Sequence, residues 1–137
     1  MQMSDTREIA APPSDVWAAL LDPEVLKACV PGCESMTGSP EAGFEAVVVQ
    51  KVGPVKARFT GVVTLSDMRP GESIKISGEG KGGPAGFAKG GATVTLAPAG
   101  AGTKLSYAVD ANVGGKIAQL GNRLIQGTAR KLAAEFF

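Results

Sequence analysis

The hydrophobic residues of the chain recur with two different periods, which divide it into three parts. Residues 13–29 and 116–132 carry apolar side chains at steps of three or four, the spacing typical of helices, whereas residues 44–113 carry them at steps of two, the spacing typical of strands. In VKARFTGVVTL, residues 55–65, the apolar face is opposite a face with Lys56, Arg58 and Thr60. The pattern predicts a half-buried antiparallel sheet with helices before and after it.

About six strands are expected, joined mostly as hairpins. Five of them are FEAVVVQKV, VKARFTGVVTL, SIKIS, ATVTLAP and TKLSYAVDANV, which Gly and Pro turns such as RPGES and PAGAG separate, and a short strand at REIA comes first.

Two short helices are expected after the first strand. Pro13 suits a first helical turn, where Ser14 and Asp15 can accept from free N–H groups. Pro23 ends this helix because it lacks an amide hydrogen, and it can open the next one with Asp22 as the cap. The sequence VPG then ends the second helix.

The apolar spacing of residues 116–132 predicts one long helix at the end of the chain. A helix of roughly 22 residues would be about 33 Å long, enough to lie across a whole sheet. Its apolar stripe consists of Ile117, Leu120, Leu124, Thr128 and Leu132. The order of elements predicts an α+β helix-grip layout in a single domain, residues 1–137.

Composition excludes several classes of function. The net charge of +1 argues against a nucleic-acid surface, and the lack of histidine disfavours triad-type catalysis and zinc sites. The N-terminus, MQMSDTREIA, lacks the apolar core of a signal peptide, and no apolar run is long enough to span a bilayer, so a cytoplasmic location is expected.

The two cysteines, Cys29 and Cys33, flank the helix-breaking residues Pro31 and Gly32. A structural zinc site needs about four ligands, which two cysteines without histidine do not supply. A disulfide is disfavoured in a reducing cytoplasm, and redox pairs usually have the tighter Cys-x-x-Cys spacing. We expect a turn with small packed thiols and no metal site.

The segment GEGKGG places Gly78, Gly80 and Gly83 in the pattern G-x-G-x-x-G. A dinucleotide site would need a helix after this pattern, but Pro84 and another strand follow. The glycines predict a hairpin at the rim of the sheet that either gates a cavity or is only twisted.

The interior of this fold is expected to be underfilled, with a dry, collapsed core as the alternative. Aromatic residues make up 5% of the chain, and Gly121 lies on the apolar face of the predicted last helix, where glycine costs about 1 kcal/mol relative to alanine. Room for a ligand, or close approach to the sheet, would offset that cost. Strand parity, the face of the last helix and the rim of the sheet predict the residues that bind a ligand. They are Phe59, Val63, Ile76, Tyr107 and Val109 by parity, Leu120, Gly121 and Leu124 from the helix, and Phe87 from the rim.

A second candidate site is a row of cations on the last helix. Lys116, Arg123 and Arg130 recur every seven residues, roughly opposite the apolar stripe. Such a row is either a solvated face or a surface that docks on anionic lipid or an acidic partner.

Four segments carry a family resemblance: VWAALLDPEVLKACVPGCE, KVGPVKARFTG, GEGKGGPAGFAKGGA and VGGKIAQLGNRLIQGTARKLAAEFF. Together they closely resemble the CoxG proteins, called the G subunit of carbon monoxide dehydrogenase, in the superfamily of START, polyketide-cyclase and birch-pollen-allergen domains. The resemblance implies a curved antiparallel sheet around a long C-terminal helix with a hydrophobic cavity between them. It also implies association with molybdenum hydroxylases of the carbon monoxide dehydrogenase type and with their attachment to the membrane.

We therefore expect a non-catalytic accessory protein without a cofactor, located in the cytoplasm and peripheral at the inner face of the membrane. Its expected ligand is a hydrophobic small molecule, an isoprenoid quinone or a lipid, and its expected partners are the molybdenum hydroxylase subunits. Two alternatives are a recruitment or maturation scaffold that acts through surface contacts only, and a cyclase- or hydrolase-like enzyme. The enzyme would have to use Asp110, Glu45, Glu79 or Tyr107 as its acid or base.

Overall fold

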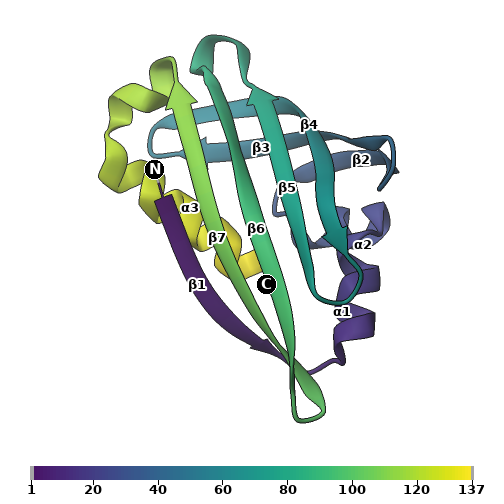
Figure 1. Cartoon of the computed structure of the whole chain (residues 1–137). Helices are drawn as coiled ribbons and strands as arrows, with labels where there is room; N and C mark the ends of the chain where they lie inside the picture. The colour runs from purple at the N-terminus through teal and green to yellow at the C-terminus, as the bar shows by residue number, and fades with distance from the viewer. Residues whose placement is uncertain (1, 137) are drawn as a thin grey trace.

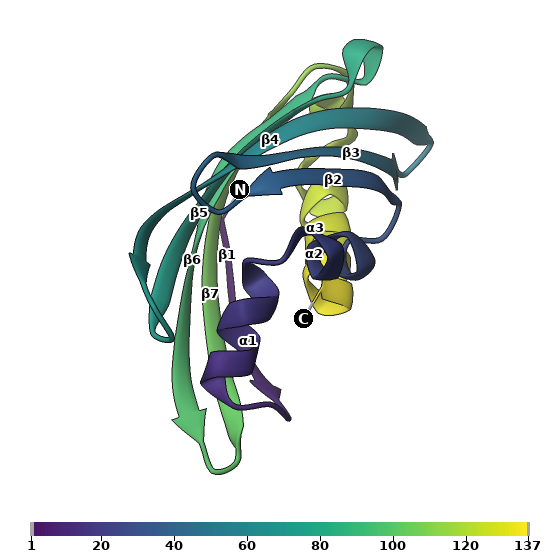
Figure 2. The same cartoon turned by 90° about the vertical axis from the view of Figure 1, so that its right-hand side faces the viewer.

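Every pair of neighbouring strands is antiparallel, and all seven strands form one curved sheet with the helices on its concave side (Figures 1 and 2). This computed structural model describes residues 2–136, and the side chains of all of these except residues 52, 122 and 132–136. The order across the sheet is β1-β7-β6-β5-β4-β3-β2. The strands are β1 (Gln2–Ile9), β2 (Cys33–Ser39), β3 (Gly43–Val52), β4 (Val55–Arg69), β5 (Ser73–Lys81), β6 (Phe87–Ala99) and β7 (Gly102–Gly114).

The sequence pattern misses one strand, β2. Its residues, CESMTGS, are mostly small and polar and do not alternate with apolar ones. The segment is a strand because it lies at the edge of the sheet and pairs with β3, so backbone hydrogen bonds rather than side-chain burial define it.

Helices α1 (Pro13–Leu20) and α2 (Pro23–Cys29) confirm the two short helices. Pro13 opens α1, but the expected capping by Ser14 and Asp15 is wrong: Pro12 holds the cap position, and no side chain there accepts a hydrogen bond. The Asp22 side chain does cap α2, since it accepts from the Glu24 amide at 2.9 Å.

The expected long C-terminal helix is present only in part. A short 3₁₀ helix, η2 (Lys116–Leu120), comes first, and α3 (Asn122–Phe136) follows after a break at Gly121. Gly121 has a φ of +93° and a ψ of 152°, a backbone conformation that is essentially restricted to glycine. Its carbonyl accepts from the Ile125 amide at 3.3 Å, so Gly121 caps α3 instead of lying within a helix.

Only the second half of the glycine-rich segment connects β5 to β6, because Gly78 and Gly80 lie within β5. The connection, residues 82–86, contains a single 3₁₀ turn, η1 (Gly83–Ala85). This connection approaches the end of β7 closely: a Cβ added at Gly86 would overlap the Gly114 carbonyl oxygen. The glycines therefore allow two backbone segments to meet, and no helix follows them that could bind a dinucleotide phosphate.

The two ends of the concave face are covered by different helices. Figure 2 shows α1 against the lower part of the sheet and α3 against the upper part. Val16 and Leu20 of α1 pack in one buried cluster with Ile74, Val94, Leu96, Leu105 and Tyr107 of the sheet. This filled core occupies the end of the fold under α1.

Candidate ligand-binding site

An apolar cavity of about 280 Å³ lies between α3 and the concave face of the sheet. Apart from Gln50 and Thr128, every lining residue that the structure describes is apolar or glycine. The lining comes from the sheet and from both C-terminal helical segments, and consists of Val48, Gln50, Phe59, Gly80, Ala88, Ala111, Val113, Ile117, Ile125, Thr128 and Ala129. We call this space the apolar cavity.

Small side chains keep the apolar cavity open. Ala88, Ala111 and Ala129 line it where larger residues would fill it. The Phe59 ring lies against the rim, since a Cβ added at Gly82 would come within 2.6 Å of its Cε1 atom. The expected underfilled interior is thus present, but only beneath α3.

A groove of about 760 Å³ lies beside the apolar cavity, between α3 and the end of β3. Its lining residues are Pro31, Gln50, Lys51, Leu120, Arg123, Leu124, Gly127, Thr128 and Lys131. Leu124 also contacts the β3–β4 turn, where a Cβ added at Gly53 would come within 2.7 Å of its Cδ2 atom. Because three of these residues are cationic and none is acidic, we call this space the basic groove.

The structure places only some of the expected ligand-binding residues at these sites. Phe59 lines the apolar cavity, and Leu120 and Leu124 line the basic groove. Tyr107 is only 5% exposed within the filled core, and Ile76 and Val109 pack against that core.

Three further expected residues lie outside both sites. Val63 is on the concave face of β4 but does not line the apolar cavity, and Gly121 is exposed at the helix break. Phe87 is 44% exposed, and its ring covers Gly114, its partner across the β6–β7 pair.

The expected cation row is not one surface. Lys116 lies in η2, before the break, whereas Arg123 and Arg130 lie on α3. Arg123 borders the basic groove, but Arg130 borders a different hollow near Gln2 and Met3 of β1.

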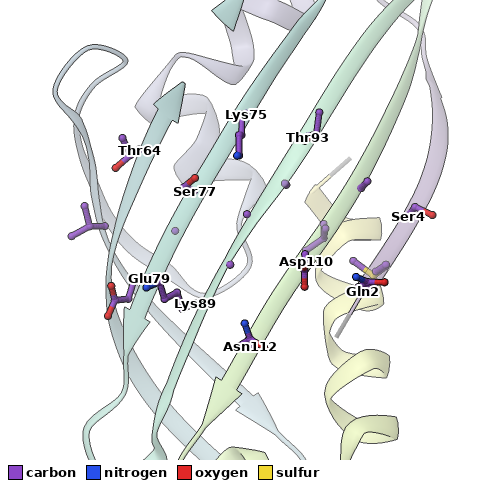
Figure 3. A pocket seen from close by; sticks show the side chains of 18 of the residues that line it. Gln2, Ser4, Thr64, Lys75, Ser77, Glu79, Lys89, Thr93, Asp110 and Asn112 are labelled. Atoms are coloured by element: carbon purple, nitrogen blue, oxygen red, sulfur yellow. The ribbon is translucent and has the colours of Figure 1, made fainter. Parts of the chain in front are cut away.

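That hollow, about 1100 Å³ in volume, lies mainly over the outer face of the sheet (Figure 3). Small residues such as Ser77, Gly91 and Ala108 form its floor, and charges of both signs surround them. The acids considered for catalysis, Asp110 and Glu79, are exposed here, Glu45 is exposed elsewhere on β3, and Tyr107 is buried in the core. The four do not converge on one pocket.

The cysteine motif forms the expected turn. Cys29 ends α2 and Cys33 begins β2; both are half-buried free thiols, and Gly32 between them has a φ of +78°. Across the described residues, no group of three His, Cys, Asp or Glu side chains is arranged to hold a metal ion. Nor is any described helix both long and apolar enough to span a bilayer.

Sequence reasoning missed most residues of the cavity because it placed the wrong part of each strand beneath the helix. The detectable signal is the spacing of Ile125 and Ala129, which are four residues apart and therefore share one face of α3. Lys51 and Lys131 of the basic groove carry no local signal, because only the tertiary fold brings β3 and α3 together.

A curved antiparallel sheet, helices on one side and an apolar cavity beneath the last helix define a helix-grip protein of the START and birch-allergen class. Comparison with solved structures agrees. A conserved protein from Geobacillus kaustophilus has a TM-score of 0.93 at 30% identity, covering 100% of this chain and 90% of that one. Ara h 8.0201 has the same fold, with a TM-score of 0.66 at 14% identity, covering 99% of this chain and 92% of that one.

A putative uncharacterized protein from Rhizobium leguminosarum has a TM-score of 0.71 at 19% identity, covering 99% of this chain and 91% of that one. No match was found among curated protein sequences. The family model for CoxG, the G subunit of carbon monoxide dehydrogenase, matches residues 6–137. The chain belongs to the CoxG family.

Proposed function

We propose that this protein is a non-catalytic accessory protein of a carbon monoxide dehydrogenase-type molybdenum hydroxylase, and that it binds a hydrophobic small molecule in the apolar cavity. The observation that carries the proposal is the apolar cavity itself, which α3 covers and whose described lining residues include just two polar ones, Gln50 and Thr128. Family membership supports the partner.

The chemistry of the lining favours an oily ligand. Each CH₂ group removed from water contributes about 0.8 kcal/mol, so one five-carbon isoprenoid unit contributes on the order of 3 kcal/mol. A typical net hydrogen bond contributes about 1 kcal/mol, so a cavity with few polar groups can still bind tightly. An isoprenoid quinone or a lipid fits this description, and carrying one would link the hydroxylase to the membrane.

The lining also favours ligand binding over catalysis. A catalytic site needs an acid or base within hydrogen-bond reach of the reacting atoms. Among the described residues that line the apolar cavity, none has a titratable side chain, because Gln50 and Thr128 do not ionise near neutral pH. Binding without turnover is the function that such a lining supports.

Native mass spectrometry of the protein purified from its own host, followed by solvent extraction, tests the proposal. We expect a bound hydrophobic molecule in the wild type and its loss in Ala129→Leu, which places a larger side chain in the apolar cavity. Ala18→Leu, the same change at an exposed position of α1, is the matched control. An empty wild-type protein that also ignores added decanol and a short-chain menaquinone analogue would contradict ligand carriage.

Co-purification with the hydroxylase distinguishes ligand carriage from the alternative, a scaffold that acts through surface contacts only. If surface contacts alone carried the function, Ala129→Leu would retain the partner and full activity in the host. We expect the partner to be retained but electron delivery to the membrane to fall, because the cavity and not the surface has been changed.

A further inference from the structure

The apolar cavity and the basic groove are adjacent. Gln50 of β3 and Thr128 of α3 line both spaces, so these two side chains are part of the wall that the spaces share. A ligand that occupies both spaces would therefore pass these two residues.

A ligand of ordinary size would need more room than the apolar cavity provides. Sites for small molecules usually measure about 300–1,000 Å³, and the apolar cavity alone, at about 280 Å³, is just below that range. The groove adds about 760 Å³. The cavity thus suits the hydrocarbon chain of a ligand, and the groove suits the remainder of the ligand.

The charges of the groove are of one sign among the residues that the structure describes. Lys51, Arg123 and Lys131 are exposed along it, and none of its described lining residues is acidic. Where side chains are described, the ion pairs are Arg7–Asp5 and Arg58–Glu34, so neither involves a cation of the groove.

One cation of the groove is also paired with a like charge on the neighbouring strand. Lys51 is directly opposite Lys56 in the register of β3 and β4, although Lys56 itself lines a separate hollow with Glu34 and Arg58. Like charges directly opposite each other in a sheet are destabilising, and an anion bound at Lys51 would relieve that repulsion. The pair therefore favours an anionic occupant of the groove over a cationic one.

We propose that the ligand is a single acidic amphiphile: its anionic headgroup lies in the basic groove near Lys51, Arg123 and Lys131, and its hydrocarbon chain enters the apolar cavity between Gln50 and Thr128. This inference rests on the proposed function and narrows its ligand class from any hydrophobic molecule to one that carries a negative charge. Long-chain carboxylates are the simplest members of that class.

Binding of decanoate and decanol, measured by titration calorimetry at low salt, tests the inference. The two probes share a chain length and differ in headgroup charge. We expect decanoate to bind about tenfold more tightly, a difference of about 1.4 kcal/mol, and we expect this preference to shrink as salt is added. The triple variant Lys51→Gln/Arg123→Gln/Lys131→Gln should lose the preference while still binding decanol.

A second triple variant, Lys75→Gln/Lys89→Gln/Lys104→Gln, removes the same charge from the outer face of the sheet and should keep the preference. Equal binding of decanoate and decanol by the wild type would overturn the inference and leave the proposed function intact. Binding of neither probe would overturn both. Binding to phosphatidylglycerol vesicles that needs the groove cations, without decanoate binding, would also overturn the inference in favour of docking on a bilayer.

Discussion

Gln50 and Thr128 face one boundary from opposite sides, one on β3 and the other on α3, and each side chain already donates a hydrogen bond within the protein. The Gln50 amide donates to the Pro31 carbonyl, and the Thr128 hydroxyl donates to the Leu124 carbonyl at 3.0 Å. A hydrocarbon chain that passes between them forms no hydrogen bond there, because it has neither donors nor acceptors. A ligand's affinity must come from burial on one side of the boundary and charge on the other.

The interior is filled under α1 and hollow under α3, so equal truncations should have unequal costs. Leu105 is fully buried in the filled core, and Leu105→Ala should reduce the free energy of unfolding by about 2–5 kcal/mol. Ile125 borders the apolar cavity, and Ile125→Ala should cost less than about 2 kcal/mol, because part of its surface has no packing partner to lose. Urea unfolding measures both values. Equal losses would mean that the space under α3 is as well packed as the core.

The break before α3 predicts that alanine substitutions at two glycines change the stability in opposite directions. Gly121→Ala should destabilise by about 1–3 kcal/mol, since alanine is strained at a φ of +93°. Gly127→Ala lies within α3, where an added Cβ meets nothing within 4 Å, and should stabilise by about 1 kcal/mol. Thermal unfolding checks the signs. If both variants were stabilised, residues 116–136 would have to form one continuous helix.

The sequence predicts which face of the sheet is buried, but not which helix covers each part of that face. Strand parity identified the concave face correctly, as Phe59 and Tyr107 both lie on it. Parity does not say which helix covers each part of a strand, so Tyr107 under α1 is buried in the core, whereas Ala111, further along the same strand, lines the apolar cavity. A strained glycine at position 121 then shifted the helical phase, which periodicity alone does not reveal.

The order of elements was easier to predict than the site. Alternation over long, half-buried strands and the proline-marked helix starts are local signals, and both were confirmed. The edge strand β2 and the basic groove depend on contacts between segments distant in sequence, such as Lys51 with the α3 side chains across the groove. Such contacts produce no periodic pattern in the sequence.

The seam between the β5–β6 connection and the end of β7 should be intolerant of side chains. Gly86→Ala should reduce stability by more than about 3 kcal/mol, because alanine is strained at a φ of +114° and its Cβ would also overlap the Gly114 carbonyl oxygen. Gly83→Ala is the control: its φ is +57°, but open space surrounds the added Cβ, so only about 1–2 kcal/mol is expected. Similar unfolding midpoints for the two variants would exclude a tight seam.

A buried hydroxyl fixes the chain that leads into α1. Thr103 is completely buried, and its Oγ1 donates to the Ala11 carbonyl at 2.6 Å. Thr103→Val keeps the shape but leaves that carbonyl unpaired, which should cost about 1–3 kcal/mol. Thr93→Val, at an exposed position of β6, should change stability by less than about 0.5 kcal/mol. Denaturant unfolding compares them, and an equally small loss at Thr103 would contradict the structural role of this hydrogen bond.

A ligand should enter the space beneath α3 and not the filled core, and isoleucine methyl groups report on both places. Ile117 and Ile125 line the apolar cavity, whereas Ile74 is 1% exposed in the filled core. Methyl NMR of isoleucine-labelled protein during titration with decanol should move the Ile117 and Ile125 signals and leave Ile74 unchanged. Saturating shifts at Ile74, or no shift at Ile117 and Ile125, would contradict a binding site beneath α3.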